Sequence, residues 1–181
     1  MKITRAQLIN VVGYADKVDS LLHYINLYLD TFHINTPQRV AHFMAQCCHE
    51  TGGLKFLKEC GNSVYFKKYD KGKLAKMLGN TKPGDGERYK GRGLIHITGR
   101  ANYQAYQDSG YCKGDIMSSP WLLEQPIGAA KSGMWWWMKH GLNELADKGD
   151  LVAVTKKVNG GTNGLEDRKR WFEKWKKALD V

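Results

Sequence analysis

The sequence lacks several features that define common protein classes. No apolar run approaches the roughly 18 residues that a membrane-spanning helix needs. The first residues, MKITRAQLINVV, have neither the long apolar core nor the small-residue cleavage site of a secretory signal. Internal repeats and low-complexity linkers are also missing. We therefore expect a soluble protein, made in the cytoplasm, whose 181 residues form one compact domain over residues 1–181.

Cysteine spacings typical of zinc sites or disulfide frameworks are absent too. The sequence has four cysteines and no CxxC pair, and the adjacent Cys47 and Cys48 would point to different faces of a helix. Reduced, mostly buried thiols are the simpler interpretation. We therefore predict neither a disulfide framework nor a bound metal.

Acidic side chains are scarce compared with basic ones. The chain has 18 Asp and Glu against 28 Lys and Arg, which gives a net charge of +10. Such a charge favours an anionic partner, and nucleic acid, an anionic membrane and bacterial wall polymer all qualify. Nucleic acid is the weakest of these, because the glycine-rich blocks of the chain match no compact DNA- or RNA-binding signature.

Helical periodicity and capping signals are what the sequence does contain. Thr4-x-x-Gln7 has the spacing of a capping box, Thr36-Pro37 that of an N-cap followed by proline, and Asp150 precedes a short apolar stripe. Further helices are predicted from residue 18, from 126 to near 141, and from 165 to about 179. The segment 54–93 is rich in Gly, Lys and Tyr and predicts loops, short helices or a small hairpin. The fold class is therefore all-α or α-dominated.

Glu50 stands where an apolar helical stripe ends. It continues a row of apolar residues at helical spacing, formed by Val40, Phe43, Met44 and Cys47. Its carboxyl should face the interior or a cleft wall, where burial disfavours the charged form, and this suits a general acid. Glu59 follows after Gly52 and Gly53. Two carboxyls across a groove are what glycosidic cleavage requires, although Glu59 alone also fits an ordinary surface glutamate.

A second block, YKGRGLIHITGRANY, covers residues 89–103. Its Gly-Arg-Gly lets the backbone approach a ligand while Arg92 is held beside it. Thr98 is expected to cap a following helix that presents Asn102 and Tyr103. Hydroxyl, amide and aromatic groups together suit a sugar, whereas the block taken alone also fits a glycine-rich connector and an ordinary helix start.

Three blocks, in this order, resemble one family. AHFMAQCCHETGG, YKGRGLIHITGRANY and the later segment with VNGGTNG are similar to glycoside hydrolase family 19, and more closely to its bacteriophage endolysin branch, which is related to plant-type chitinases. The resemblance runs from about Thr36 to Arg168. It implies a mostly helical, lysozyme-like fold with a central cleft between two lobes, and a single catalytic domain without a separate cell-wall-binding domain.

The resemblance also implies roles for particular residues. Glu50 matches the general acid, Glu59 the general base of an inverting reaction, and Thr98 the hydroxyl residue that helps to hold the attacking water. Arg168 matches an arginine that can pair with a catalytic-site carboxylate. The expected substrate-binding residues are His49, Tyr89, Arg92, His96, Asn102, Tyr103, Asn159 and Arg168, with His96 standing where the family usually has glutamine.

The implied function is that of a phage-type endolysin, which hydrolyses the β-1,4 glycan of peptidoglycan and lyses its host. The resemblance implies no metal or organic cofactor and a monomer. It also implies a holin, because an enzyme made in the host cytoplasm reaches the wall and periplasm only after the membrane is permeabilised. A chitinase on the same fold is the alternative, since both substrates contain N-acetylglucosamine.

Three further interpretations carry less weight. A Cys/His amidase or peptidase is disfavoured because neighbouring helical residues such as Cys48 and His49 diverge in direction. HETGG also lacks the second histidine of a zinc hydrolase motif. Finally, the basic face of residues 165–179 could contact an anionic membrane or lipopolysaccharide, whereas an amphipathic helix that packs its aromatic face on the core explains the same pattern.

Overall fold

The fold consists almost entirely of helices. The structure is a computed structural model that describes residues 1–13 and 18–181. Helix makes up 62% of it, with no β-sheet in the described residues, so the α-dominated prediction is confirmed. In chain order the elements are α1 (Arg5–Val12), α2 (Val18–Tyr28), α3 (Pro37–Thr51), α4 (Ser63–Phe66), η1 (Lys67–Asp70), α5 (Gly72–Leu78), α6 (Asp85–Arg88), α7 (Arg100–Gln107), η2 (Pro120–Glu124), α8 (Pro126–Lys139), α9 (Leu142–Asp147), α10 (Leu151–Asn159) and α11 (Leu165–Leu179).

Three helices begin at the capping residues that the sequence predicts. The Thr4 side chain accepts from the backbone N–H of Gln7, whose own side chain accepts from the Thr4 N–H. Thr36 caps α3 through the N–H of Arg39, and Asp150 caps α10. Each cap satisfies backbone donors that have no partner inside the helix. Local signals therefore determine where these helices start.

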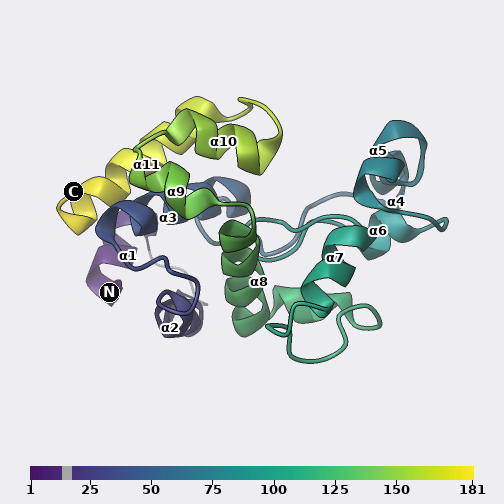
Figure 1. Cartoon of the computed structure of the whole chain (residues 1–181), viewed down its shortest axis with the longest axis horizontal. Helices are drawn as coiled ribbons and strands as arrows, with labels where there is room; N and C mark the ends of the chain where they lie inside the picture. The colour runs from purple at the N-terminus through teal and green to yellow at the C-terminus, as the bar shows by residue number, and fades with distance from the viewer. Residues whose placement is uncertain (14–17) are drawn as a thin grey trace.

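Most of the buried core lies in a large lobe, formed by α1–α3 and α8–α11. The helices α3 and α11, which are far apart in the chain, pack side by side; α1 also contacts α11, and α2 lies against α8 (Figure 1). Between residues 40 and 48 of α3 every side chain is buried. The last turn of α3, which carries Glu50, is therefore the end of a helix that is buried in the core over most of its length.

A small lobe, formed by α4, η1, α5 and α6, lies at the opposite end of the molecule from α1 and α11 (Figure 1). It consists of short helices and loops, as predicted for the middle of the chain. The alternative of a small hairpin is not found: the described residues form only isolated bridges there, Lys58 with Arg92 and Arg92 with Ile97. Gly and Lys are too frequent in this segment to give a continuous β ladder.

The aromatic face of α11 packs on the core. Trp175 is fully buried and Phe172 is nearly so, while the lysines Lys169, Lys174 and Lys177 stay exposed. These aromatics are therefore not available to enter a lipid surface in this fold. None of the described helices is long and apolar enough to cross a membrane.

Candidate active site

Glu50 lies in the last turn of α3. The helix ends one residue later, at Thr51, because Gly52 adopts a left-handed conformation with φ of 59° and its N–H bonds back to Cys48 and His49. The Glu50 side chain is 19% exposed. Glu50 is thus partly buried at the edge of the core, as its place on the apolar stripe predicts.

Arg168 from α11 pairs with Glu50. Its Nη2 atom lies 2.5 Å from Glu50 Oε1, and its Nη1 donates to the side-chain oxygen of Gln46. Arg168 is 0% exposed, so this is a buried cation whose charge is balanced by one carboxylate. Its Nε has no hydrogen-bond partner among the described residues. The structure therefore pairs Arg168 with Glu50, where the family resemblance implied only a catalytic-site carboxylate, and adds Gln46, which sequence reasoning missed although it lies one helical turn before Glu50.

His49 connects the end of α3 with the start of α11. Its Nδ1 lies 2.7 Å from Asp167 Oδ2, and that oxygen also accepts from the indole N–H of Trp171. The ring of His49 lies against Gly164, where an added Cβ would come within 2.3 Å of the ring. His49 thus fixes the end of the asparagine-containing loop next to Glu50. Asn159, the last residue of α10 and the start of that loop, is exposed, and its side chain has no hydrogen bond within the described chain.

Glu59 lies in the segment between α3 and α4 and is held by the opposite lobe. Its Oε1 accepts from the phenol of Tyr65 at 2.9 Å and from that of Tyr69 at 2.8 Å. Its Oε2 accepts from the N–H of Gly91 at 3.2 Å, and the Glu59 N–H donates to the carbonyl of Gly91. Glu59 is half-buried. Neither tyrosine was predicted, because only the folding of the short helices α4 and η1 brings these side chains to Glu59.

Thr98 lies close to Glu59. A Cβ added at Gly91 would be 3.2 Å from Thr98 Oγ1, 3.4 Å from Glu59 Cβ and 3.0 Å from His96 Cβ, so these three residues surround one point. The Thr98 hydroxyl donates to the carbonyl of His96. The predicted capping role of Thr98 is wrong: Gly99 takes the N-cap position of α7 and no side chain caps that helix. The Thr98 hydroxyl is thus bonded within its own loop and not to the start of α7.

His96 and Asn102 are partly exposed neighbours of Thr98. His96 has a φ of 54°, and its Nε2 lies 3.0 Å from the carbonyl oxygen of Phe56, where the ring can only donate. Asn102 donates to the carbonyl of Thr98 from the first turn of α7. Both side chains hold the loop that carries Thr98, and direct contact of either with a sugar stays a prediction.

Three predicted substrate contacts lie inside the core instead. Tyr103 is 0% exposed, and its phenol donates to the carbonyl of Lys90 and accepts from Arg92. Tyr89 is 2% exposed, with its ring centroid 5.1 Å from that of Tyr103, and the 8% exposed Arg92 also pairs with Glu124. The expectation that they touch the sugar is therefore corrected. Their polar atoms are already satisfied, so they support the 89–99 loop from beneath.

The environments of Cys47 and Cys48 do not suit nucleophilic catalysis. Burial raises the pKa of Cys47, and burial also raises the pKa of Cys48 to about 12. A nucleophilic cysteine needs the thiolate, which burial disfavours here. All four cysteines are free, and within the described residues no group of three or more His, Cys, Asp or Glu side chains is arranged to hold a metal.

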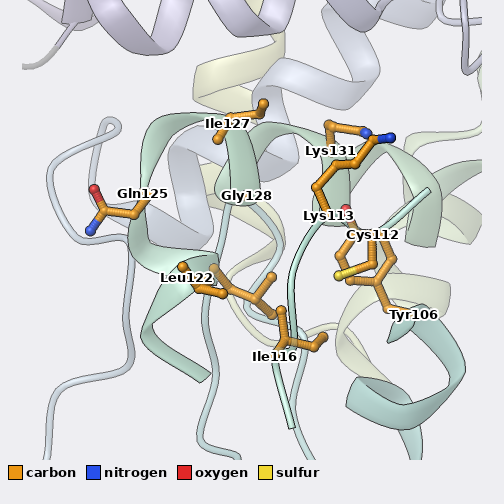
Figure 2. Close-up of a pocket in the computed structure, with 10 residues that line it drawn as sticks. Tyr106, Cys112, Lys113, Ile116, Leu122, Gln125, Ile127, Gly128 and Lys131 are labelled. Carbon is orange, nitrogen blue, oxygen red and sulfur yellow. The ribbon is translucent and has the colours of Figure 1, made fainter. Parts of the chain in front are cut away.

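A pocket lies away from Glu50, Glu59 and Thr98, between α7, η2 and α8. Figure 2 shows Ile116, Leu122 and Ile127 around an apolar interior, with the amines of Lys113 and Lys131 on one side. Its lining includes none of the predicted site residues. The predicted site residues and this pocket therefore do not coincide.

Comparison with known proteins identifies the family of this chain. The family model described as class I chitinase, glycoside hydrolase family 19, matches residues 30–155. A glycosyl hydrolase family 19 domain-containing protein from Haemophilus influenzae is 35% identical over 160 residues, which cover 75% of this chain and 76% of the relative. The chain belongs to glycoside hydrolase family 19. Glu50, Glu59 and Thr98 all lie inside the matched segment of this family 19 chain, whereas Asn159 and Arg168 lie beyond it.

Solved structures of family 19 enzymes share the fold of this chain. Chitinase C from Streptomyces griseus superposes with a TM-score of 0.76 at 22% identity, covering 99% of this chain and 93% of its own. A bacterial family 19 chitinase gives a TM-score of 0.77 at 20% identity, covering 99% and 95%. A class IV chitinase from Zea mays gives 0.65 at 22% identity, covering 98% and 86%. The lysozyme-like, helix-dominated fold and glycoside hydrolase membership are thus established together.

Proposed function

We propose that the chain is a phage-type endolysin, an inverting glycosidase that hydrolyses the β-1,4 glycan of bacterial peptidoglycan and lyses the host cell. Family membership supplies the glycoside hydrolase chemistry. The observation that supports the mechanism is that the two carboxyls have different partners: Glu50 contacts a buried cation, whereas Glu59 contacts neutral phenols and a backbone amide. Different environments for two carboxyls are what separate an acid from a base.

In this mechanism Glu50 protonates the glycosidic oxygen. Arg168 occupies Oε1 of Glu50, and Oε2 has no hydrogen-bond partner among the described residues, so Oε2 is the oxygen that can carry the proton to the sugar. As the proton leaves, negative charge develops on Glu50. The fixed guanidinium of Arg168 stabilises that charge, and a preorganised cation is most effective when it contacts a group whose charge increases in the transition state.

Glu59 accepts a proton from the attacking water. The water oxygen bonds to the anomeric carbon while the bond to the leaving oxygen breaks, so the configuration inverts. Thr98, whose hydroxyl oxygen lies by the same point as Glu59, helps to hold the water. No step requires a metal or an organic cofactor.

The choice of peptidoglycan over chitin is supported by charge. Peptidoglycan carries peptide carboxylates, whereas chitin is neutral, and a net charge of +10 attracts the anionic polymer. On this proposal a monomeric enzyme reaches the wall after a holin permeabilises the host membrane. The second candidate is a chitinase, which the class I chitinase family model favours.

Product analysis tests the proposal. Purified peptidoglycan and chitin are digested separately, and the new reducing ends are identified by mass spectrometry. New reducing ends on peptidoglycan glycan, with slower cleavage of chitin, are the expected result. Faster cleavage of chitin would favour the second candidate, and free peptide ends without cut glycan would overturn the glycosidase assignment on peptidoglycan.

The anomer of the first product tests the mechanism independently. An inverting enzyme holds its carboxyls roughly 6.5–9.5 Å apart and releases the α anomer, whereas a retaining enzyme holds them about 5–5.5 Å apart and releases the β anomer. The product is read by NMR before mutarotation. A β anomer would contradict the role of Glu59 as a base that acts through water.

A further inference from the structure

The carboxylate of Glu59 has an unequal set of donors. Two phenols, from Tyr65 and Tyr69, converge on Oε1, at 2.9 and 2.8 Å. Oε2 receives a single N–H, that of Gly91, at the longer distance of 3.2 Å. A carboxylate oxygen offers about two lone-pair sites. Oε1 is therefore saturated, and Oε2 retains one site.

The donor to Oε2 belongs to the 89–99 loop, which also carries Thr98. Gly91, the donor to Oε2, is also the residue beside which the Thr98 hydroxyl lies, 3.2 Å from the position of an added Cβ. The phenols approach Oε1 from α4 and η1 of the small lobe. The two oxygens of Glu59 thus contact different parts of the molecule.

We propose that Tyr65 and Tyr69 are positioning residues for the base: by occupying Oε1 they orient the Glu59 carboxylate so that Oε2 takes the proton from water. This inference rests on the proposed function, in which Glu59 is the base. The proton passes from water to Oε2, the water oxygen bonds to the anomeric carbon, and the leaving oxygen takes the proton of Glu50. The phenols keep their protons throughout.

The surrounding residues hold the two phenols in place. Asn62 caps α4 by accepting from the N–H of Tyr65, and Phe66 anchors the turn in the lobe, with its ring centroid 5.2 Å from that of Tyr65. The ammonium of Lys68 lies 3.4 Å from the Tyr65 ring centroid and 4.7 Å from that of Tyr69. Burial, together with the hydrogen bond to Glu59, raises the pKa of Tyr69, so this phenol remains a donor at working pH.

Phenylalanine substitutions test the inference, because they remove the hydroxyl and keep the ring. Tyr65→Phe and Tyr69→Phe are each expected to lower kcat on soluble peptidoglycan fragments about 10-fold, with KM changed less than about twofold, because a carboxylate that has lost a donor at Oε1 is held less firmly in its working orientation. Tyr24→Phe on α2 is the matched control and should leave kcat unchanged. Unchanged kcat in the Tyr65→Phe/Tyr69→Phe double variant would overturn the inference.

A double-mutant cycle with Glu59→Gln separates positioning from simple support of the lobe. If the phenols act through the base, their removal should change kcat less than about twofold once Glu59 is already Gln. An equal loss in both backgrounds would mean that the tyrosines only stabilise the small lobe, and would overturn the inference. If the Tyr65→Phe/Tyr69→Phe double variant does not fold, the cycle is measured with Tyr65→Phe alone, because Tyr65 is half-exposed.

The same cycle separates a failed inference from a failed proposed function. Full activity of Glu59→Gln would show that another group is the base, which rejects the proposed mechanism and the inference with it. Strong loss in Glu59→Gln, with wild-type kcat in both tyrosine variants, would reject the positioning role alone.

Discussion

The two candidate catalytic carboxyls are held in different ways. Glu50 ends a 15-residue helix that packs along α11, another helix of 15 residues, and its cation Arg168 is completely buried. Glu59 lies in an irregular segment, and one of its two phenol partners, Tyr65, is 43% exposed. The proposed acid is placed by regular helix packing, whereas the proposed base is placed by two phenols from short helices and by bonds to Gly91.

This difference has an energetic consequence. Changes on the acid side remove interactions that hold α3 to α11, so they should affect stability and activity together. Changes on the base side remove hydrogen bonds that half-exposed groups can replace with water, so they should affect activity with little change in stability. Four experiments probe the contrast between the Glu50 side and the Glu59 side and the packing of α3 in the large lobe. They are given in order of decreasing effect.

Replacing the acid should have the largest effect on activity. Glu50→Gln keeps an oxygen that can accept from Arg168 but cannot donate a proton to the sugar, so glycan hydrolysis should fall on the order of 10²- to 10⁴-fold while the chain stays folded. Rates on purified peptidoglycan and the melting temperature are measured together. Glu173→Gln, at an exposed site on α11, is the control. Retained activity in folded Glu50→Gln would remove Glu50 from the mechanism.

Removing the buried cation should have the largest effect on stability. Arg168→Met leaves Glu50 without its cation and Gln46 without a donor, which should lower the free energy of unfolding by about 3–5 kcal/mol. Arg170→Met, at a 72% exposed site on the same helix, should cost at most about 1 kcal/mol, and Tyr65→Phe on the base side about 0.5 kcal/mol. Urea unfolding measures all three. Equal losses of unfolding free energy in Arg168→Met and Tyr65→Phe would contradict the contrast between the Glu50 side and the Glu59 side.

Acid should destabilise the large lobe through His42. This ring is fully buried on α3 against Phe172, and burial lowers its pKa to about 4 from an ordinary value of about 6.5. The unfolded chain therefore binds the proton first, so stability is full above pH 6.5 and falls as the pH drops toward 4, by at most about 3 kcal/mol. His42→Leu should flatten this dependence in unfolding measurements between pH 7 and 4. An unchanged slope would mean that other groups cause it.

A glycine pair tests how closely α11 must approach α3. Gly164 and Gly160 both have positive φ, of 73° and 78°, so alanine should cost about 1 kcal/mol at either position. Only at Gly164 would the new Cβ also meet the His49 ring. Gly164→Ala should therefore cost about 1–2 kcal/mol more and lower activity, whereas Gly160→Ala should not. Thermal unfolding and hydrolysis rates compare the two, and equal behaviour would show that the ring moves freely.

The sequence predicts the acid side better than the base side. Helix starts at Thr4, Thr36 and Asp150 follow from local capping chemistry, and the place of Glu50 follows from helical periodicity. The fold and the pairing of Arg168 with Glu50 were available only through the family resemblance, because 118 positions separate these two residues. Periodicity reports which face of a helix is buried, but not which distant helix covers it.

The errors in the prediction are in the glycine-rich block of residues 89–103, which spans a loop and the start of α7. Thr98 looked like a cap, yet Gly99 takes that position, and Tyr103 looked like a sugar contact, yet it is buried. Polar and aromatic residues in a glycine-rich block can face a ligand or support the loop from inside, and composition does not distinguish these cases. Tyr65 and Tyr69 show the same limit, because only the folded small lobe brings them to Glu59.

The pairing of α3 with α11 also sets an order of events during synthesis. Arg168 leaves the ribosome 118 residues after Glu50, so the acid is made long before its cation and before the helix that covers α3. Contacts between segments so distant in the chain form late and slow the completion of folding. A nascent chain that stops before residue 165 is therefore expected to have no hydrolytic activity, even when the Glu59 loop is already complete.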